Sequence, residues 1–145
     1  MIVRAAIAGD LAWVLEVERG AETAPHWGEA EYLRILAGEG VARCLLVAEG
    51  GFAVGKVVAG VGELESVVVA EGARRRGVGR ALCGAVVEWC RNLGAGEVEL
   101  EVRAGSLGAR RLYEGLGFVE VGRRVRYYDE PVDDAVLMRL ELGPA

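Results

Sequence analysis

The chain has 145 residues, of which 52% are hydrophobic and 27% charged, and its formal net charge is −5 at pH 7. This length is enough for one buried core, so residues 1–145 are expected to form a single domain. No apolar run reaches the roughly 18 residues of a membrane span, and the acidic balance argues against general binding to nucleic acid or anionic membranes. The first residues lack the pattern of a secretory signal, which predicts a cytoplasmic protein.

The pattern of the first half of the chain is interrupted by glycines. It predicts, in chain order, a strand at residues 2–3, a helix from the N-cap Asp10 to Gly20, a helix at 28–37, and strands at 44–48, 53–59 and 63–70. Gly50-Gly51 has the chemistry of a hairpin turn, so the two strands beside it are expected to pair antiparallel. The Val67-Val68-Val69 run does not alternate, which is typical of a central strand covered on both faces.

The second half opens with a helix. Apolar residues recur every three or four positions from Val78 to Leu93, and Gly94 ends the helix. The pattern then predicts an alternating strand at 97–103, a helix at about 106–116, strands at 118–125 and 135–142, and a polar loop between these strands that contains Tyr127, Tyr128 and Pro131. The resulting order, β-α-α-β-β-β-α-β-α-β-β, indicates a mixed sheet with helices on both faces.

Cysteine and histidine point to no metal or redox chemistry. Cys44, Cys83 and Cys90 form no Cys-x-x-Cys pair, so neither a disulfide framework nor a structural zinc site is predicted. Cys83 and Cys90 fall on one expected helix face, where small buried side chains are the simpler interpretation. The single histidine, His26, is assigned no chemistry, and no metal is expected.

The segment Arg74-Arg75-Arg76-Gly77-Val78-Gly79 joins the valine strand to the long helix, and Arg80 follows it. Its two glycines let backbone N–H groups approach a ligand, and a helix N-terminus adds unpaired donors and partial positive charge. Together with the arginines these features predict an anion cradle suited to pyrophosphate. A P-loop would need a Gly-Lys-Ser/Thr ending, and a dinucleotide fingerprint would need glycine where Leu82 stands.

This Arg-x-x-Gly-x-Gly motif resembles the acetyl-CoA motif of the GCN5-related N-acetyltransferase (GNAT) superfamily. Within it, the chain is similar to the RimI-type ribosomal-protein-alanine N-acetyltransferases in the motifs Leu100-Glu101-Val102-Arg103-Ala104, Leu112-Tyr113-Glu114-Gly115-Leu116-Gly117-Phe118, Arg124-x-x-Tyr127-Tyr128 and Asp134-Ala135-x-x-Met138. The resemblance implies a mostly antiparallel sheet of about seven strands, flanked by about four helices and splayed near its centre. It also implies that acetyl-CoA binds in the wedge between the strands at 66–70 and 97–103.

The resemblance assigns the cofactor a set of contacts, which are Ser66, Val67, Val68, Val69, Arg74, Arg75, Arg76, Gly77, Val78, Gly79, Arg80 and Ser106. The main chain of the valine strand would pair with the pantetheine arm, and one of its N–H groups would stabilise the oxyanion. The valine side chains offer no polar atoms, so any polar contact there must use the main chain. Ser106 stands where the family usually places asparagine, which gives a shorter reach and fewer donors.

Acetyl transfer needs an uncharged amine and a proton for the departing thiolate. The resemblance makes Glu101 the general base and Tyr113 the general acid. The plainer alternatives are a solvated glutamate beside Glu97 and Glu99 and an aromatic residue packed on an amphipathic helix. A non-catalytic acyl-CoA sensor would be favoured by loss of the base and the acid, and both residue types are present.

The expected acceptor is the N-terminal α-amine of a protein, an alanine of a ribosomal protein by resemblance. An α-amino group has a pKa of about 7.7–8.0 and is partly neutral at physiological pH, whereas lysine at about 10.4 is protonated. Two interpretations are open for the acidic residues Glu63, Glu65, Asp129, Glu130, Asp133 and Asp134: an acidic entrance for a basic peptide, or, as the simpler account of most of them, a solvated surface. The alternative is an enzyme for a small-molecule amine, a polyamine or an antibiotic, which would differ in residues 25–40 and 127–134. The oligomeric state is left open.

Overall fold

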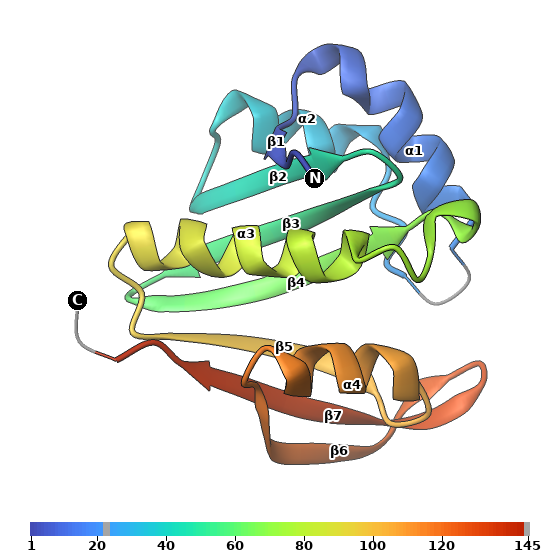
Figure 1. Cartoon of the computed structure of the whole chain (residues 1–145), viewed down its shortest axis with the longest axis vertical. Coiled ribbons are helices and arrows are strands. Elements are labelled where there is room, and N and C mark those ends of the chain that lie inside the picture. Colours follow the sequence, from blue (N-terminus) through green and yellow to red (C-terminus); the bar gives the residue numbers. More distant parts are fainter. Residues whose placement is uncertain (22–23, 144–145) are drawn as a thin grey trace.

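The computed structural model describes residues 1–21 and 24–143 as one seven-stranded sheet flanked by helices (Figure 1). The strands lie in the order β1-β2-β3-β4-β5-β7-β6, and their bounds are β1 Arg4–Ala5, β2 Ala42–Ala48, β3 Gly51–Val58, β4 Val61–Val69, β5 Glu97–Arg103, β6 Val119–Asp129 and β7 Val132–Glu141. The helices are α1 Leu11–Arg19, α2 Glu29–Ala37, α3 Val78–Asn92 and α4 Leu107–Gly115, with short 3-10 turns η1 Ala8–Asp10 and η2 Glu71–Ala73. Among the described strands, β4 and β5 alone pair in parallel. The predicted order and the mixed, mostly antiparallel sheet are confirmed.

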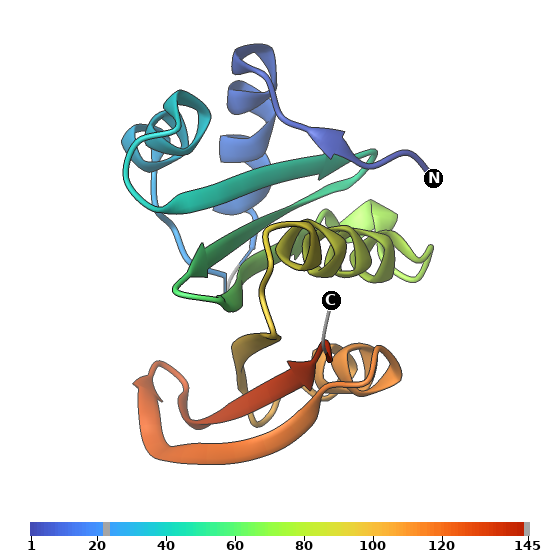
Figure 2. The same ribbon diagram turned by 90° about the vertical axis from the view of Figure 1, so that its left-hand side faces the viewer.

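Two hydrophobic cores form, one on each face of the sheet. Buried residues of α3, among them Leu82 and Val86, join the apolar face of β5 and Phe118, and α4 packs against this cluster. On the opposite face, Val14 of α1 and Tyr32 of α2 pack against Phe52 and Val54 of β3. Figure 2 shows α3 and α4 on one side of the sheet, away from α2. Within residues 1–21 and 24–143, the other face of β5, β7 and β6 is therefore left without a covering helix.

A β-bulge in β4 separates the two halves of the sheet. Val54 lies opposite Ser66 and Gly55 lies opposite Leu64, so Glu65 is the extra residue. A bulge bends its strand and increases the local twist. The parallel pairing of β4 with β5 ends at Glu63 and Glu99, just before the bulge. The two strands then diverge, as Figure 1 shows, which confirms the expected splay.

The valine run beyond the bulge is covered on both faces, as predicted. Val68 packs in the core beneath α1 and α2, and Val67 and Val69 pack against the core beneath α3. The three cysteines are buried free thiols, and burial raises the pKa of Cys44 and Cys83 to about 12. The interpretation of Cys83 and Cys90 as small buried side chains is therefore confirmed.

Two local predictions were wrong, and a third holds in position only. The first strand is Arg4–Ala5 rather than residues 2–3, and Ile2 is exposed. Asp10 is the N-cap residue of α1, as predicted, but its side chain makes no capping hydrogen bond, because its carboxylate accepts from the Ile7 N–H and pairs with Arg4 at 2.8 Å. The predicted polar loop at 126–134 is mostly strand, since β6 continues to Asp129 and pairs with β7 through Tyr128 and Asp133.

No helix within the described ranges is long and apolar enough to cross a membrane.

Candidate functional site

A cleft of about 910 Å³ opens where β4 and β5 diverge. Its walls come from both faces of the sheet, because the connection between α1 and α2 lines it together with α3, α4 and β6. The residues predicted from the sequence that line it are Ser66, Val67, Val68, Val69, Arg74, Arg75, Gly77, Val78, Gly79, Arg80, Glu101, Ser106 and Tyr113. The fold therefore brings together residues from four separate stretches of the chain.

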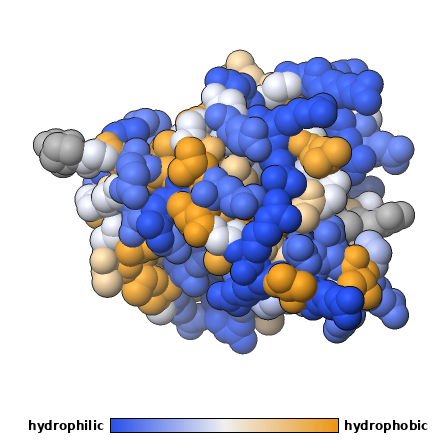
Figure 3. Space-filling view, turned by 90° about the horizontal axis from the view of Figure 1, so that it is seen from below, coloured by the Kyte–Doolittle hydropathy of each residue, from blue (hydrophilic) through white to orange (hydrophobic). Residues whose placement is uncertain are grey.

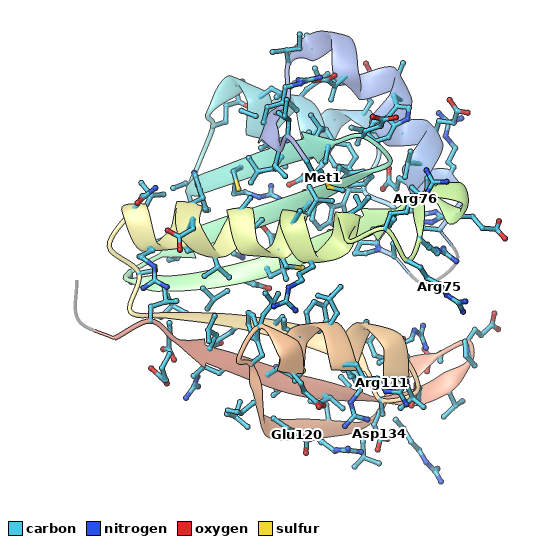
Figure 4. The ribbon with its side chains drawn as sticks, in the orientation of Figure 1. Met1, Arg75, Arg76, Arg111, Glu120 and Asp134 are labelled. Atoms are coloured by element: carbon cyan, nitrogen blue, oxygen red, sulfur yellow. The ribbon has the colours of Figure 1, made fainter. Side chains whose placement is uncertain are left out.

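Arg76 is the exception among the predicted residues. It lines a second cavity of about 870 Å³, which is bordered by Met1 and Trp13. Figure 4 shows Arg76 on the Met1 side of the loop and Arg75 on the opposite side. Arg75 has a left-handed backbone, with φ of 66°, so the chain turns sharply between these two side chains.

The main chain of β4 faces the cleft at alternate residues. The Ala70 N–H donates to the Gly50 carbonyl at 2.8 Å, which makes this pair a hydrogen-bonded pair of the β3–β4 ladder. Hydrogen-bonded and non-bonded pairs alternate along antiparallel strands. Val67 and Val69 therefore direct their N–H and C=O groups away from β3, toward the space where β5 has left the sheet. This is an open strand edge of the kind to which an extended ligand can pair.

The turn before α3 has the geometry that the glycine motif predicts. Gly77 is the N-cap of the 15-residue helix α3 and has a left-handed backbone, with φ of 79°. Glycine adopts this conformation without the penalty that a β-carbon imposes. Gly79, by contrast, is buried where a β-carbon would meet Leu112 of α4 at 3.1 Å, so it permits close packing rather than a turn.

The arginines of this turn supply unbalanced positive charge. In the part of the chain that the structure describes, Arg74, Arg75 and Arg80 form no ion pair with an acidic side chain. Arg74 instead donates from Nε to the Val69 carbonyl at 3.4 Å. Guanidinium groups beside the N-terminus of a helix suit phosphate.

Tyr113 and Glu101 line the cleft from different elements, α4 and β5. Tyr113 packs edge-on against Phe118, with ring centroids 6.0 Å apart, and burial raises the pKa of its hydroxyl. The hydroxyl thus stays protonated at neutral pH. Glu101 lies on the uncovered face of β5, where its carboxylate is 3.7 Å from Arg124 Nη2 and a third of its side chain is exposed.

Ser106 occupies the N-cap position of α4. Its side chain makes no capping hydrogen bond, and it lines the cleft. The hydroxyl is thus directed to no backbone group of its own helix, although serine at this position usually caps.

One wall of the cleft is absent from the site residues predicted from the sequence, although residues 127–134 were expected to differ with the acceptor. Tyr127 and Tyr128 of β6 line it, and the guanidinium of Arg103 lies over the Tyr128 ring at 4.1 Å. The Arg124-x-x-Tyr127-Tyr128 motif is the signal for this wall in the sequence, although the pattern predicts a loop there rather than a strand. Ala21, Ala24 and Pro25 contribute a further wall from the connection between α1 and α2.

That connection is held in place by polar contacts. The buried carboxylate of Glu18 accepts a hydrogen bond from the Trp27 N–H, and burial, together with the charge of Glu18, raises the pKa of Tyr32. His26 donates from Nε2 to the Ala21 carbonyl at 2.7 Å, which is a structural role.

The expected acidic entrance forms only in part. Glu63 and Glu65 line the cleft, but Lys56 pairs with Glu63 at 3.2 Å and Arg43 pairs with Glu65 at 3.0 Å. The remaining acidic residues of that expectation, Asp129, Glu130, Asp133 and Asp134, lie in the hairpin between β6 and β7 and are absent from the lining of the cleft within the described ranges.

Similarity to known proteins was found at several levels. An uncharacterized protein of Mycobacterium leprae is 40% identical over 79 residues, which cover 54% of this chain and 21% of that protein. The ribosomal protein bS18-alanine N-acetyltransferase of Escherichia coli is 35% identical over 94 residues, 63% of this chain and 64% of that enzyme. The chain thus spans less than two thirds of the length of these two relatives.

Longer matches define the family. The ribosomal protein bS18-alanine N-acetyltransferase of Salmonella typhimurium is 32% identical over 139 residues, 92% of this chain and 93% of that enzyme. The crystal structure of the ribosomal-protein-S18-alanine N-acetyltransferase from Escherichia coli matches with a TM-score of 0.83 and 30% identity, covering 99% of this chain and 95% of that chain. The model of the acetyltransferase (GNAT) family matches residues 13–118. Because this match takes in well over half of the sequence, the chain belongs to the acetyltransferase (GNAT) family.

Proposed function

We propose that this chain is an acetyl-CoA-dependent N-acetyltransferase that acetylates the N-terminal α-amine of a protein, with alanine as the first residue and a ribosomal protein as the acceptor. The observation that carries the proposal is the cleft that crosses the sheet where β4 and β5 diverge. A cleft of this form lets two substrates meet from opposite faces of the sheet.

Acetyl-CoA would supply an activated acetyl thioester, and the residues on the α3 and α4 side fit its parts. The Val67 and Val69 main chain offers paired donors and acceptors to the amide groups of the pantetheine arm. The Gly77 turn, the N-terminus of α3 and the guanidinium groups of Arg75 and Arg80 suit the pyrophosphate. The uncapped hydroxyl of Ser106 is available to the same ligand.

The chemistry follows from the remaining groups of the cleft. Glu101 takes the proton that the amine loses as its nitrogen bonds to the thioester carbon, through a water where the distance requires one. A β4 main-chain N–H stabilises the oxyanion that forms on the carbonyl oxygen. The carbon–sulfur bond then breaks, and Tyr113 donates its hydroxyl proton to the departing thiolate.

An α-amine is the nucleophile that this site can deprotonate most readily. The pKa of a lysine amine is about 2.5 units higher than that of an α-amine, so its deprotonation would cost roughly 3.4 kcal/mol more. We take the part of the cleft that is lined by Ala21, Ala24, Tyr127 and Tyr128 as its acceptor side, and the small alanine side chains there suit a small first residue such as alanine. Relatives that match over nearly the whole chain are named as alanine N-acetyltransferases of a ribosomal protein, which supports the same acceptor class.

The test is thiol release from acetyl-CoA in the presence of three acceptors. An Ala-initiated ribosomal peptide is expected to react fastest, ahead of a peptide whose only amine is an internal lysine and ahead of polyamines. Faster turnover of the lysine peptide or of a polyamine would overturn the acceptor class. Binding of acetyl-CoA without turnover of any amine would favour the non-catalytic sensor instead.

A further inference from the structure

The end of the β6–β7 hairpin is docked onto the turn between β5 and α4. Arg103, the last residue of β5, donates from Nη1 to the Pro131 carbonyl at 3.0 Å and covers the Tyr128 ring. The next residue, Ala104, donates its N–H to the Asp134 carbonyl at 2.9 Å. Two consecutive residues, Arg103 and Ala104, therefore join the hairpin to this turn.

Asp133 provides the side-chain contact of this junction. Its Oδ2 accepts a hydrogen bond from the Gly105 N–H at 3.0 Å, and its Oδ1 accepts one from the Asp134 N–H at 2.8 Å. A β-carbon on Gly105 would lie 3.0 Å from Asp133 Oδ2, so the carboxylate sits directly against the main chain. Gly105 immediately precedes Ser106, the N-cap of α4 that lines the cleft.

On the other side of Asp133, the hairpin carries the tyrosine wall of the cleft. Arg124 lies opposite Ala135 and Tyr128 lies opposite Asp133, so β6 has three residues between these pairs and β7 has one. The extra residues include Arg126, which has a left-handed backbone with φ of 51°. The Arg126 N–H donates to Asp134 Oδ1 at 2.9 Å, so the carboxylate beside Asp133 supports the bulge that presents Tyr127. Figure 4 marks Asp134 in this part of the molecule.

We propose that Asp133 is a positioning residue, which holds the tyrosine wall of β6 in register with the start of α4 and thereby sets the geometry of the acceptor side of the cleft. The proposal rests on the proposed function, because it assigns Tyr127 and Tyr128 to acceptor binding. Asp133 itself is absent from the described lining of the cleft and acts through the hairpin.

Loss of the Asp133 side chain should free the β6–β7 hairpin from the turn before α4 and leave α4 in place. Leu112 and Tyr113 of α4 pack against the core beneath α3. β6, by contrast, is an edge strand that is exposed along most of its length. Figure 3, which views the molecule from the β6 and β7 end, shows hydrophobic groups separated by hydrophilic ones there. Without the Asp133 contact, the tyrosine wall should move while the cofactor side keeps its shape.

The kinetic test compares Asp133→Ala with Asp129→Ala. Both changes remove one carboxylate from the same hairpin, but Asp129 forms no side-chain hydrogen bond or ion pair within the described residues. Asp133→Ala is expected to raise KM for an Ala-initiated peptide about tenfold, the effect of losing a charge-assisted hydrogen bond, with KM for acetyl-CoA changed less than about twofold. Asp133→Asn, which keeps one acceptor oxygen, should fall between the wild type and Asp133→Ala.

Three kinetic results would overturn the proposal. These are an unchanged peptide KM in folded Asp133→Ala, an equal rise in KM for acetyl-CoA, and an equal effect of Asp129→Ala. The last of these would mean that only the charge of the hairpin matters.

A second measurement needs no enzymatic activity. Trypsin cleavage after Arg124 and Arg126, followed by mass spectrometry, should be about tenfold faster in Asp133→Ala than in Asp129→Ala. Equal cleavage rates would show that Asp133 does not hold the hairpin. If the wild type acetylates no peptide, the proposed function fails, and the cleavage rates still decide whether Asp133 holds the hairpin.

Discussion

Gly79 of α3 approaches Leu112 of α4 so closely that a β-carbon on the glycine would lie 3.1 Å from the leucine Cδ1. The same β-carbon would lie 3.6 Å from Val69 Cγ2 on β4. Gly79 therefore sets how closely α3 packs against two walls of the cleft.

Gly79→Val is expected to weaken acetyl-CoA binding at least about tenfold, because the larger side chain pushes α3 from α4 and β4 at the cost of overpacking, about 1–3 kcal/mol. Calorimetric titration with acetyl-CoA measures the affinity. Gly84→Val is the matched control, since a β-carbon at Gly84 of the same helix meets nothing within 4 Å. Unchanged affinity in a folded Gly79→Val protein would show that the turn before α3 is not part of the acetyl-CoA site.

Tyr113→Phe should separate binding from chemistry. The phenyl ring keeps the packing against Phe118, so acetyl-CoA affinity is expected to stay within about twofold. Loss of the hydroxyl proton should lower kcat about 100-fold or more, the usual contribution of a general acid. Steady-state turnover and calorimetry on the same preparation test both parts. Equal turnover in the variant would make Tyr113 a packing residue only.

The fold was largely predictable because its buried elements carry strong periodic patterns. The apolar positions of α3 recur on one face, and β5 alternates valine and leucine with charged residues, so their types could be read without a structure. The predicted strand at 118–125 ends earlier than β6 for the opposite reason. From Arg123 to Tyr127 it is exposed, and a strand without a buried face has no alternation to detect.

The site was predictable where the motif fixes the backbone and less so where the side-chain direction depends on local geometry. Gly77 was found because a left-handed N-cap favours glycine. The direction of the Arg76 side chain was not predicted, because it depends on the positive φ of Arg75. Arginine seldom adopts a positive φ. The bulge at Glu65, which opens the cleft, likewise has no residue signature in the sequence.

The buried thiol of Cys90 should make the free energy of unfolding fall at alkaline pH. Burial raises the pKa of its thiol to about 11, whereas an unfolded cysteine titrates near about 8.5. Between these values the folded state binds more protons than the unfolded state, so the free energy of unfolding falls as pH rises. The stability difference between the wild type and Cys90→Ala should therefore shrink from about pH 8.5 to about pH 11. Urea unfolding followed by tryptophan fluorescence measures it, and a difference that stays constant over this range would contradict the prediction.

Glu101→Gln tests the general base and the acceptor class together. If Glu101 deprotonates an α-amine, the variant should be slowest relative to the wild type near neutral pH, where most of the amine still carries its proton. As pH rises through about 8, the amine loses its proton to solvent, and the defect should shrink. With a lysine peptide the same recovery should need a range about 2.5 units more alkaline. The ratio of wild-type to variant kcat/KM, measured at each pH for both peptides, gives the two profiles.

A small defect that does not vary with pH would dismiss Glu101 as the base and leave it as the partner of Arg124. A large defect with faster turnover of the lysine peptide would instead keep the base and dismiss the N-terminal acceptor.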